Sequence, residues 1–466
     1  MIPRIPLRQA ITDANLLGNA LVGDSWRAWR TMLIAAMGEE LTNEERAIFT
    51  KLTGREREPG QRVTELVAIV GRRGGKSRAM AVLMAYVAGL CDHSDLLVRG
   101  ERGVALCISL DQKVAAIVRD HCAAAFEDSP ILRQLIANRT QETIELTNGI
   151  SIEVRPASFR KLRGPTYVSV AADEIAFWYS EDGIYRNPAP EILNAVRPGL
   201  LTTRGPLVLA SSPYSKAGPL WDRFRKHYGP DGAPVILVAH GTSRDFNPTL
   251  PQAEIDRALE EDQARNTAEY LAQFRNDLEG YVSIEVVEGC VGGHREILPA
   301  AGNTYRAFVD PAGGSGEDSF SAAIGHKSLP DDQIIVDAVR EFRPRFSPAA
   351  VIDELAPWLA SYRITRLTGD HFAGEFPREL FRKHGIHYEV CKQAKSDLYR
   401  DFLPLLNSGR IVLPRNDRLV AQIVGLERRV TRVGKDDILH PPHQHDDLSN
   451  AAAGLASCIR VQASFS

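Results

Sequence analysis

The fold is decided by residues 66–77, LVAIVGRRGGKS, where an apolar run passes directly into a basic glycine loop and then into a helix-forming segment. This order is typical of a P-loop, whose backbone N–H groups point at phosphate oxygens at the start of a helix. Gly74 and Gly75 allow the backbone to approach a phosphate closely. Lys76 would bind the outer phosphate oxygens, and Ser77 would bind Mg²⁺. The stretch therefore predicts a nucleoside triphosphate site.

A second apolar run ends in two acids, in YVSVAADE at residues 167–174. Asp173 is suited to hold Mg²⁺, and Glu174 to orient or deprotonate the attacking water. Taken alone, the glycine loop could be a basic turn between a strand and a helix, because Val70 stands where the general pattern has glycine. The acidic pair alone could be a solvated strand end. Their occurrence together favours an ATP-hydrolysing site.

Phosphoryl transfer gains from an arginine that neutralises the developing charge, and several arginines are candidates. Arg72 and Arg73 lie inside the loop, where they would also contact the nucleotide. Arg160 and Arg163 precede the acidic run, and we assign the catalytic role to Arg163. Each arginine could act within its own subunit or on a neighbouring one, and each could instead be a surface cation. A γ-phosphate sensor could lie at SSP, residues 211–213, after another predicted strand.

Strand and helix signals alternate along the chain in two blocks, which predicts two α/β domains. Residues 1–285 are expected to form a P-loop ATPase domain with a parallel sheet, a first strand near Glu65–Val70 and a helical segment over about residues 1–60. A linker is expected at residues 286–304. Residues 305–466 begin with three meandering strands and continue with alternating helices and strands, the order of an RNase H-like nuclease domain.

Aspartates in the second block form a candidate metal site. Asp310 and Asp370 end strand-like runs, and Asp446 and Asp447 open an apolar helix. Two-metal nucleases clamp their cations with acids from distant segments, so all four are candidate ligands, and Asp310, Asp370 and Asp447 are candidate catalytic groups. Asp447 is favoured as the direct ligand because it shares a helix face with Ala451, whereas Asp446 could cap the helix. Each aspartate alone could be an ordinary strand end.

Two further groups of residues near these acids have competing interpretations. His440, His443 and His445 could form a transition-metal site, but adjacent prolines favour a stiff exposed loop in which one histidine at most touches the scissile phosphate. Lys392 and Lys395 follow a predicted strand and could grip a DNA backbone or lie in a solvated loop.

The composition limits the class of protein. A chain of 466 residues exceeds one typical domain, and its 44% hydrophobic and 25% charged residues are ordinary for a globular protein. A net charge of −3 means that any contact with nucleic acid must use local basic patches. Six cysteines without paired spacing favour reduced thiols over a zinc module. We expect no membrane span and no export signal.

These motifs resemble those of the large terminase subunit of tailed bacteriophages, and the resemblance spans nearly the whole chain. It rests on GRRGGKS at 71–77, VAADE at 170–174, SSP at 211–213, Asp310, Asp370 and HDD at 445–447. Family P-loops often replace the leading glycine and carry arginine, so Val70 fits the family. An N-terminal adenine-contacting segment of the family is similar to WRAW at residues 26–29. Trp26 is therefore a candidate nucleotide contact, although it and Trp29 share a helix face and could be core.

The resemblance implies a motor that uses ATP and Mg²⁺ to move double-stranded DNA into a procapsid. It also implies a nuclease, with Mg²⁺ or Mn²⁺, that cuts concatemeric DNA. The partners implied are a small terminase subunit, which recognises the DNA site, and the portal protein. Subunits would form a homo-oligomeric ring when assembled and could be monomeric in isolation. The implied location is the host cell cytoplasm.

Three other functions remain open at this point. The first is a P-loop DNA translocase or helicase whose RNase H-like domain is a non-catalytic scaffold. Asp310, Asp370 and Asp447 discriminate here, because a scaffold has no reason to bring them together. The second is a recombination or repair nuclease with an accessory ATPase. The third, a non-enzymatic binding protein, agrees with neither set of residues.

Overall fold

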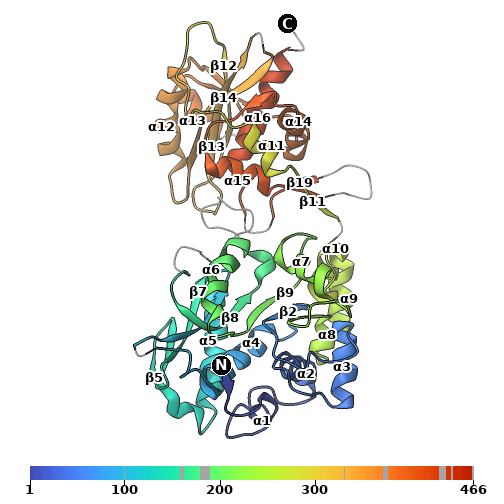
Figure 1. The fold of residues 1–466 in the computed structure, drawn as a ribbon. Coiled ribbons are helices and arrows are strands. Elements are labelled where there is room, and N and C mark those ends of the chain that lie inside the picture. Colours follow the sequence, from blue (N-terminus) through green and yellow to red (C-terminus); the bar gives the residue numbers. More distant parts are fainter. Residues whose placement is uncertain are drawn as a thin grey trace. The chain divides into compact units, whose positions relative to one another are not determined.

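The computed structural model describes residues 1–98, 100–157, 162–178, 189–275, 277–329, 331–370, 376–429, 437–441 and 444–463. These residues fall into two compact units, which are divided at residue 276 (Figure 1). Each unit has its own sheet and its own hydrophobic cores. None of the described helices is both long and apolar enough to span a membrane.

The first unit is built on an eight-stranded sheet in which the strand of the glycine loop and the strand of the acidic pair are separated by a single strand. In sheet order the strands are β10 (Ile236–Gly241), β2 (Glu65–Val70), β9 (Leu207–Ser211), β8 (Thr166–Asp173), β4 (Gly103–Ser109), β7 (Ile150–Pro156), β6 (Thr143–Leu146) and β5 (Ile136–Arg139). Strands β10 to β7 are parallel, while β6 and β5 add an antiparallel edge. The predicted parallel sheet is confirmed.

Strand β2 is buried on both faces, which explains its continuous apolar sequence. Leu66 and Ala68 belong to one core, and Val67 and Ile69 belong to the other, as the two-residue period of a strand requires. The first core is covered by α1 (Leu7–Ala10), α2 (Arg27–Ala36), α3 (Asn43–Thr53), α4 (Lys76–Leu90) and α5 (Gln112–Glu127). The second is covered by α6 (Ala189–Leu201) and α7 (Gly218–His227). Three further helices are α8 (Ser243–Phe246), α9 (Gln252–Glu261) and α10 (Gln263–Leu271).

The second unit contains a six-stranded mixed sheet. In sheet order its strands are β16 (His387–Val390), β15 (Arg366–Gly369), β12 (Tyr305–Asp310), β13 (Phe320–Ser328), β14 (Gln333–Phe342) and β17 (Ile411–Val412). Strands β12, β13 and β14 form an antiparallel meander, and β15 and β16 continue parallel to β12. The order predicted for an RNase H-like domain is therefore confirmed.

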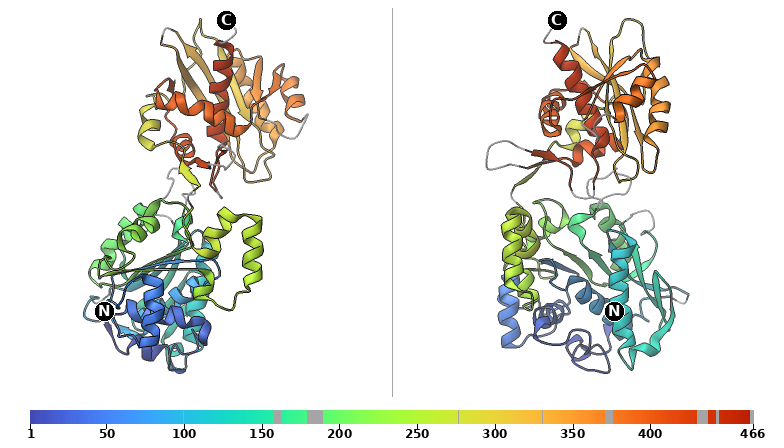
Figure 2. Two further views of the ribbon diagram at one scale, coloured as in Figure 1. Left: turned by 90° about the vertical axis from the view of Figure 1, so that its right-hand side faces the viewer. Right: turned by 180° about the vertical axis from the view of Figure 1, so that it is seen from behind.

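Helices cover both faces of this second sheet (Figure 2). One face carries α16 (Asp447–Ala463), α14 (Lys395–Asn407), α15 (Asp417–Gly425) and the short α11 (Ile284–Gly289). The other face carries α12 (Pro348–Ser361) and α13 (Phe376–Lys383). Helix α16 packs against β12, β13, β14 and β15, so its first turn lies beside the ends of the strands that carry the acids.

The division between the units lies earlier in the chain than the sequence suggested, and residues 286–304 are not a linker. Val287 is fully buried in the core beneath α14 and α15. Further along, the Trp358 indole donates a hydrogen bond to Glu296 Oε1 at 2.8 Å. Upstream, β11 (Leu278–Gly280) pairs with β18 (Glu427–Arg429), which pairs in turn with β19 (Asp437–Leu439). The glycines at 289–293 therefore interrupt a segment that packs onto the second unit.

Candidate active sites

The glycine loop joins the end of β2 to the start of α4 and has the backbone conformation that a phosphate-binding loop needs. Gly75 has a φ of +84° and Arg73 a φ of +63°, so the chain turns through the left-handed region twice before the helix begins at Lys76. A Cβ on Gly74 would lie 2.5 Å from Val70 Cγ1. The loop is thus compact, and the N-terminus of α4 points its free N–H groups toward the space above it.

Two side chains from outside the motif hold the loop in this shape. The indole Nε1 of Trp29 donates to the Gly74 carbonyl at 2.6 Å, and Trp29 itself is buried. The Ser243 hydroxyl donates to the Arg72 carbonyl at 2.6 Å. These two hydrogen bonds engage carbonyls of the loop and restrain its backbone.

The predicted nucleotide contact at Trp26 lies against this loop. A Cβ on Gly75 would lie 2.8 Å from Trp26 Cζ3, and the Arg78 guanidinium stands 5.2 Å from the centre of the Trp26 ring. Trp26 is half-buried, whereas Trp29 belongs to the core. The contact of Trp26 with adenine stays a prediction, and the structure adds a direct contact with the glycine loop.

The lysine and the acids predicted for hydrolysis are brought together by the parallel sheet. Lys76 Nζ lies 3.4 Å from Glu174 Oε1, and it also donates to the Val70 carbonyl at 3.1 Å. The Ser77 hydroxyl donates to Asp173 Oδ2 at 3.1 Å. The carboxyl ends of parallel strands meet at one sheet edge, which is why residues almost a hundred positions apart become neighbours.

Strand β9 lies between the two motif strands and supplies the predicted serine. The Ser211 hydroxyl donates to Glu174 Oε2 at 3.0 Å, so Glu174 is held between a lysine and a hydroxyl. Glu174 has a φ of +51°, a left-handed conformation that is strained for a residue with a side chain. Both contacts fix its carboxylate beside the lysine of the glycine loop.

Asp173 has the surroundings of a cation ligand. Burial, with a further contribution from the Glu174 charge, raises its pKa to about 7, while Lys76 and the Ser77 hydrogen bond oppose the shift. Its Oδ1 is buried and has no hydrogen-bond partner. A buried oxygen without a partner is unfavourable. A Mg²⁺ ion beside Ser77, or a water bound to that ion, would satisfy Asp173 Oδ1, and the carboxylate and hydroxyl oxygens are ligands that Mg²⁺ prefers.

The structure does not bring Arg163 to this site. It precedes β8, whereas Asp173 ends β8, and a strand rises about 3.3 Å per residue. Arg163 is therefore on the order of 20 Å from the nucleotide site of its own subunit. Arg160 lies outside the described residues. Arg72 and Arg73 are exposed on the loop itself, and a role for Arg163 on a neighbouring subunit stays a prediction.

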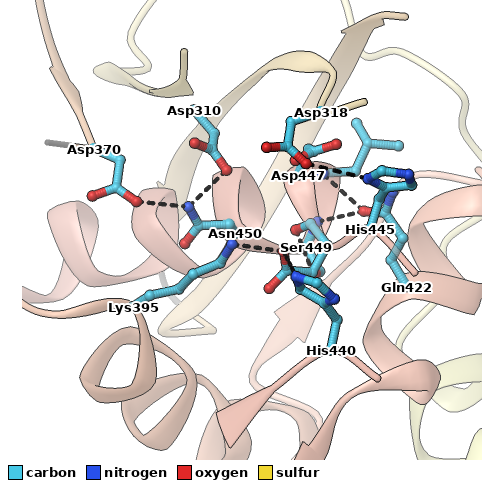
Figure 3. A network of polar contacts seen from close by, with 12 residues as sticks. Asp310, Asp318, Asp370, Lys395, Gln422, His440, His445, Asp447, Ser449 and Asn450 are labelled. Carbon is cyan, nitrogen blue, oxygen red and sulfur yellow. Dashed lines mark hydrogen bonds and ion pairs between the residues drawn. The ribbon is translucent and has the colours of Figure 1, made fainter. Parts of the chain in front are cut away.

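In the second unit, the sheet brings Asp310 and Asp370 to a common hydrogen-bond donor (Figure 3). Asp310 ends β12, and Asp370 directly follows β15, which pairs in parallel with β12. Asn450 Nδ2 donates to Asp310 Oδ2 at 2.8 Å and to Asp370 Oδ2 at 3.1 Å. Two of the predicted acids thus face each other across one amide.

Asp447 completes the carboxylate group from the first turn of α16. Its Oδ2 accepts the Ser319 N–H at 2.9 Å. Desolvation is the main cause that raises the pKa of Asp310 to about 8, and the charges of Asp447 and Asp370 add to it against Lys395 and Asn450. Desolvation also raises the pKa of Asp447 to about 6. The charges of Asp447 and Asp370 therefore lie close enough to Asp310 to affect its ionisation.

Asp446 is held by protein groups on both of its carboxylate oxygens. Its Oδ1 forms an ion pair with Lys395 Nζ at 2.6 Å, and its Oδ2 accepts the Tyr399 hydroxyl at 2.9 Å. Both oxygens are engaged by protein groups, so Asp447 is the more available ligand of the pair, and a metal-ligand role for Asp446 and a DNA contact of Lys395 stay predictions. The Asp446 side chain does not cap α16, because Gln422 Oε1 accepts the first helical N–H groups.

The two described histidines, His440 and His445, do not form a metal site with the acids. His445 Nδ1 lies 3.3 Å from Asp318 Oδ1, and His440 Nε2 lies 3.9 Å from Asp446 Oδ1. His443 lies outside the described residues. Within the described ranges, no set of three or more His, Cys, Asp or Glu side chains is close enough together to hold a metal ion. Asn450 instead spans the two central carboxylates.

The donor set around Asp310 nevertheless has the chemistry of a Mg²⁺ or Mn²⁺ site. It consists of carboxylates and a carboxamide, which offer the oxygen ligands that these ions prefer. The Oδ1 of Asn450 is buried and has no hydrogen-bond partner. Sequence reasoning missed Asn450, although its spacing of three residues from Asp447 places both on one face of α16 and was a usable signal.

Comparisons with known proteins gave matches among solved structures alone. No protein-family model and no curated protein matches the chain. The large terminase of bacteriophage HK97 is 13% identical, with 94% of this chain and 100% of that one covered and a TM-score of 0.39. The large-terminase ATPase domain of Thermus phage P74-26 is 17% identical over 51% of this chain and 96% of its own, with a TM-score of 0.37.

A third match covers a smaller share of the chain. The magnesium-bound large-terminase nuclease of the thermophilic phage G20c is 13% identical over 37% of this chain and 95% of its own, with a TM-score of 0.33. TM-scores this low do not support an inference about function. The assignment of function therefore rests on the residues of the two sites.

Proposed function

We propose that the chain is the large subunit of a tailed-phage DNA-packaging terminase. In this proposal ATP hydrolysis drives double-stranded DNA into a procapsid, and a two-metal endonuclease cuts the concatemer. The observation that carries the proposal is the presence of two sites in one chain. The first is a P-loop site in which Lys76 lies beside Glu174. The second is an RNase H-like sheet in which Asp310 and Asp370 accept hydrogen bonds from the same amide. The sequence motifs that resemble this family are the same residues.

In the ATPase, Lys76 and the loop N–H groups would bind the phosphates, and Ser77 and Asp173 would hold Mg²⁺. Bound Mg²⁺ supplies positive charge next to the phosphates during transfer. Lys76 now lies beside Glu174, so a phosphate that attracts the lysine would release the carboxylate. Glu174 would then orient or deprotonate the attacking water while the Ser211 hydroxyl fixes its position.

In the nuclease, Asp310, Asp370 and Asp447 would hold the divalent cations, Mg²⁺ or Mn²⁺. Bound cations supply charge to the attacking and leaving oxygens of the phosphodiester. Without a cation the Asp310 carboxyl is largely protonated at neutral pH, because its pKa is about 8. Binding of a cation must therefore release this proton. The His445 ring, held by Asp318, is the candidate for a contact with the scissile phosphate.

Double-stranded DNA as the substrate is supported by an open groove along β16, the edge strand of the second sheet. Its charged lining consists of Arg378, Glu379, Arg382, His387, Glu389 and Lys392. The groove borders the acids, since Tyr388 lines it and donates its hydroxyl to the Asp370 carbonyl at 2.7 Å. Exposed cations of this kind bind phosphate without reading sequence. Sequence recognition would accordingly belong to a small terminase subunit.

The remaining parts of the proposal follow the resemblance. The portal protein of the procapsid would be the docking surface. The subunits would assemble there into a homo-oligomeric ring, in the host cell cytoplasm, and could be monomeric when isolated. An arginine from a neighbouring subunit would then reach the nucleotide, which is the remaining role for Arg163.

The test follows cleavage of plasmid DNA with Mg²⁺ or Mn²⁺ and DNA-stimulated ATPase in the same samples. Asp310→Ala should abolish cleavage and keep ATPase, and Glu174→Gln should abolish ATPase and keep metal-dependent nicking. This double separation would support two independent sites in one motor. No cleavage by the wild type, with ATPase intact, would indicate a translocase with an idle RNase H-like domain. A preference for branched or damaged DNA would indicate a repair nuclease.

A further inference from the structure

Asn450 occupies an unusual position in the carboxylate site. It lies on α16, one turn after Asp447, and its side chain is completely buried. Its Nδ2 donates to Asp310 and Asp370 at 2.8 and 3.1 Å, while its Oδ1 has no hydrogen-bond partner (Figure 3). The amide thus supports two acids and leaves its own acceptor unsatisfied.

This arrangement is energetically unfavourable for an asparagine whose role is only structural. A buried carbonyl oxygen without a donor is unfavourable, and natural cores rarely retain one. The two ends of a carboxamide have similar size, and rotation about the Cβ–Cγ bond exchanges Nδ2 and Oδ1. A divalent cation between Asp310 and Asp370 would repel the amide N–H groups and attract the oxygen. The same side chain therefore suits both states of the site.

We propose that Asn450 is an oxygen ligand of the cation held by Asp310 and Asp370, and that its amide group takes the place of the cation when none is bound. The proposal rests on the proposed nuclease function, since it assumes a cation between these acids. A carboxylate at position 450 would be a fourth acid in a site where the charges of Asp370 and Asp447 already act unfavourably on Asp310. A neutral amide binds both acids without this repulsion.

The test is calorimetric titration of Mn²⁺ into the full chain without nucleotide, so that the P-loop site has no phosphate to recruit metal. The difference between the wild type and Asp310→Ala defines the site. Asn450→Ala should weaken Mn²⁺ binding about tenfold, the lower end of the range for lost support around a metal. The matched control is Gln422→Ala, because Gln422 is also a buried amide and caps the same helix at Leu448 and Ser449. It should change Mn²⁺ affinity less than threefold.

A second variant separates a ligand from a structural support. Asn450→Asp keeps an oxygen and adds a charge, so it should lower the Tm of the metal-free protein and increase the rise in Tm that Mn²⁺ produces. Unchanged Mn²⁺ affinity in Asn450→Ala would overturn the proposal, as would an equal loss in Gln422→Ala, which would assign the effect to the position of α16. If Asp310→Ala binds Mn²⁺ as the wild type does, the cation site and the nuclease part of the proposed function fail together.

Discussion

Trp29→Phe tests how the glycine loop is held, because it removes one hydrogen bond and keeps an aromatic ring. The Trp29 indole donates to the Gly74 carbonyl at 2.6 Å and packs against Phe246 with ring centres 4.8 Å apart. Phenylalanine retains most of this packing but leaves the buried Gly74 oxygen without its donor. A buried acceptor that loses its partner costs about 1–3 kcal/mol, so we expect a loss of about 2 kcal/mol in the free energy of unfolding.

Trp29→Phe should also weaken the binding of ATP. The peptide group that carries the Gly74 carbonyl also carries the Gly75 N–H, one of the donors that a P-loop directs at phosphate. Without the indole this peptide can rotate, so ATP affinity should fall about tenfold, which corresponds to about 1.4 kcal/mol. The effect should appear in Kd rather than only in turnover, because the loop binds the ground state.

Urea denaturation would measure stability, and calorimetric titration of Mg-ATP would measure affinity. The control is Trp221→Phe in the aromatic cluster of α7, where Trp221 meets Phe274 edge to face and does not contact the glycine loop. It should leave ATP affinity unchanged. Wild-type ATP affinity in Trp29→Phe, together with lowered stability, would refute the link between the indole and the loop. Unchanged stability would refute the hydrogen-bond argument itself.

Three further predictions concern single side chains. Mn²⁺ affinity at the Asp310 site should rise about tenfold per pH unit up to about pH 8 and then level off, because the cation must displace one proton from Asp310. Calorimetric titrations from pH 6 to 9 that show no pH dependence would contradict this. Lys395→Met should lower stability to urea by about 3 kcal/mol because it leaves Asp446 buried and unpaired, and a neutral result would mean that Tyr399 suffices. Arg163→Ala should leave the ATP affinity of monomeric protein unchanged; a large loss would refute its placement away from the nucleotide site.

Several features of the fold could be predicted from the sequence because they depend on neighbouring residues. The strand over Glu65–Val70 was predicted at its observed ends, since an apolar run that stops at a glycine loop is a local signal. The meander at the start of the second sheet was equally visible as three short apolar runs joined by turns. The sequence alone also indicates that Arg163 lies away from the nucleotide site of its own subunit, because a residue before a parallel strand lies at the opposite end of that strand from a residue after it.

Other features were decided by tertiary structure alone. Nothing near residue 29 indicates that its indole will meet Gly74, and nothing near Asp446 indicates that Lys395 will neutralise it. The sequence by itself determined which residue types end each strand, and hence the two candidate chemistries. Packing determined which side chains face each other there, because strand order and helix placement bring together atoms that are distant in the chain. Asn450, between two acids from separate strands, is the clearest product of that second step.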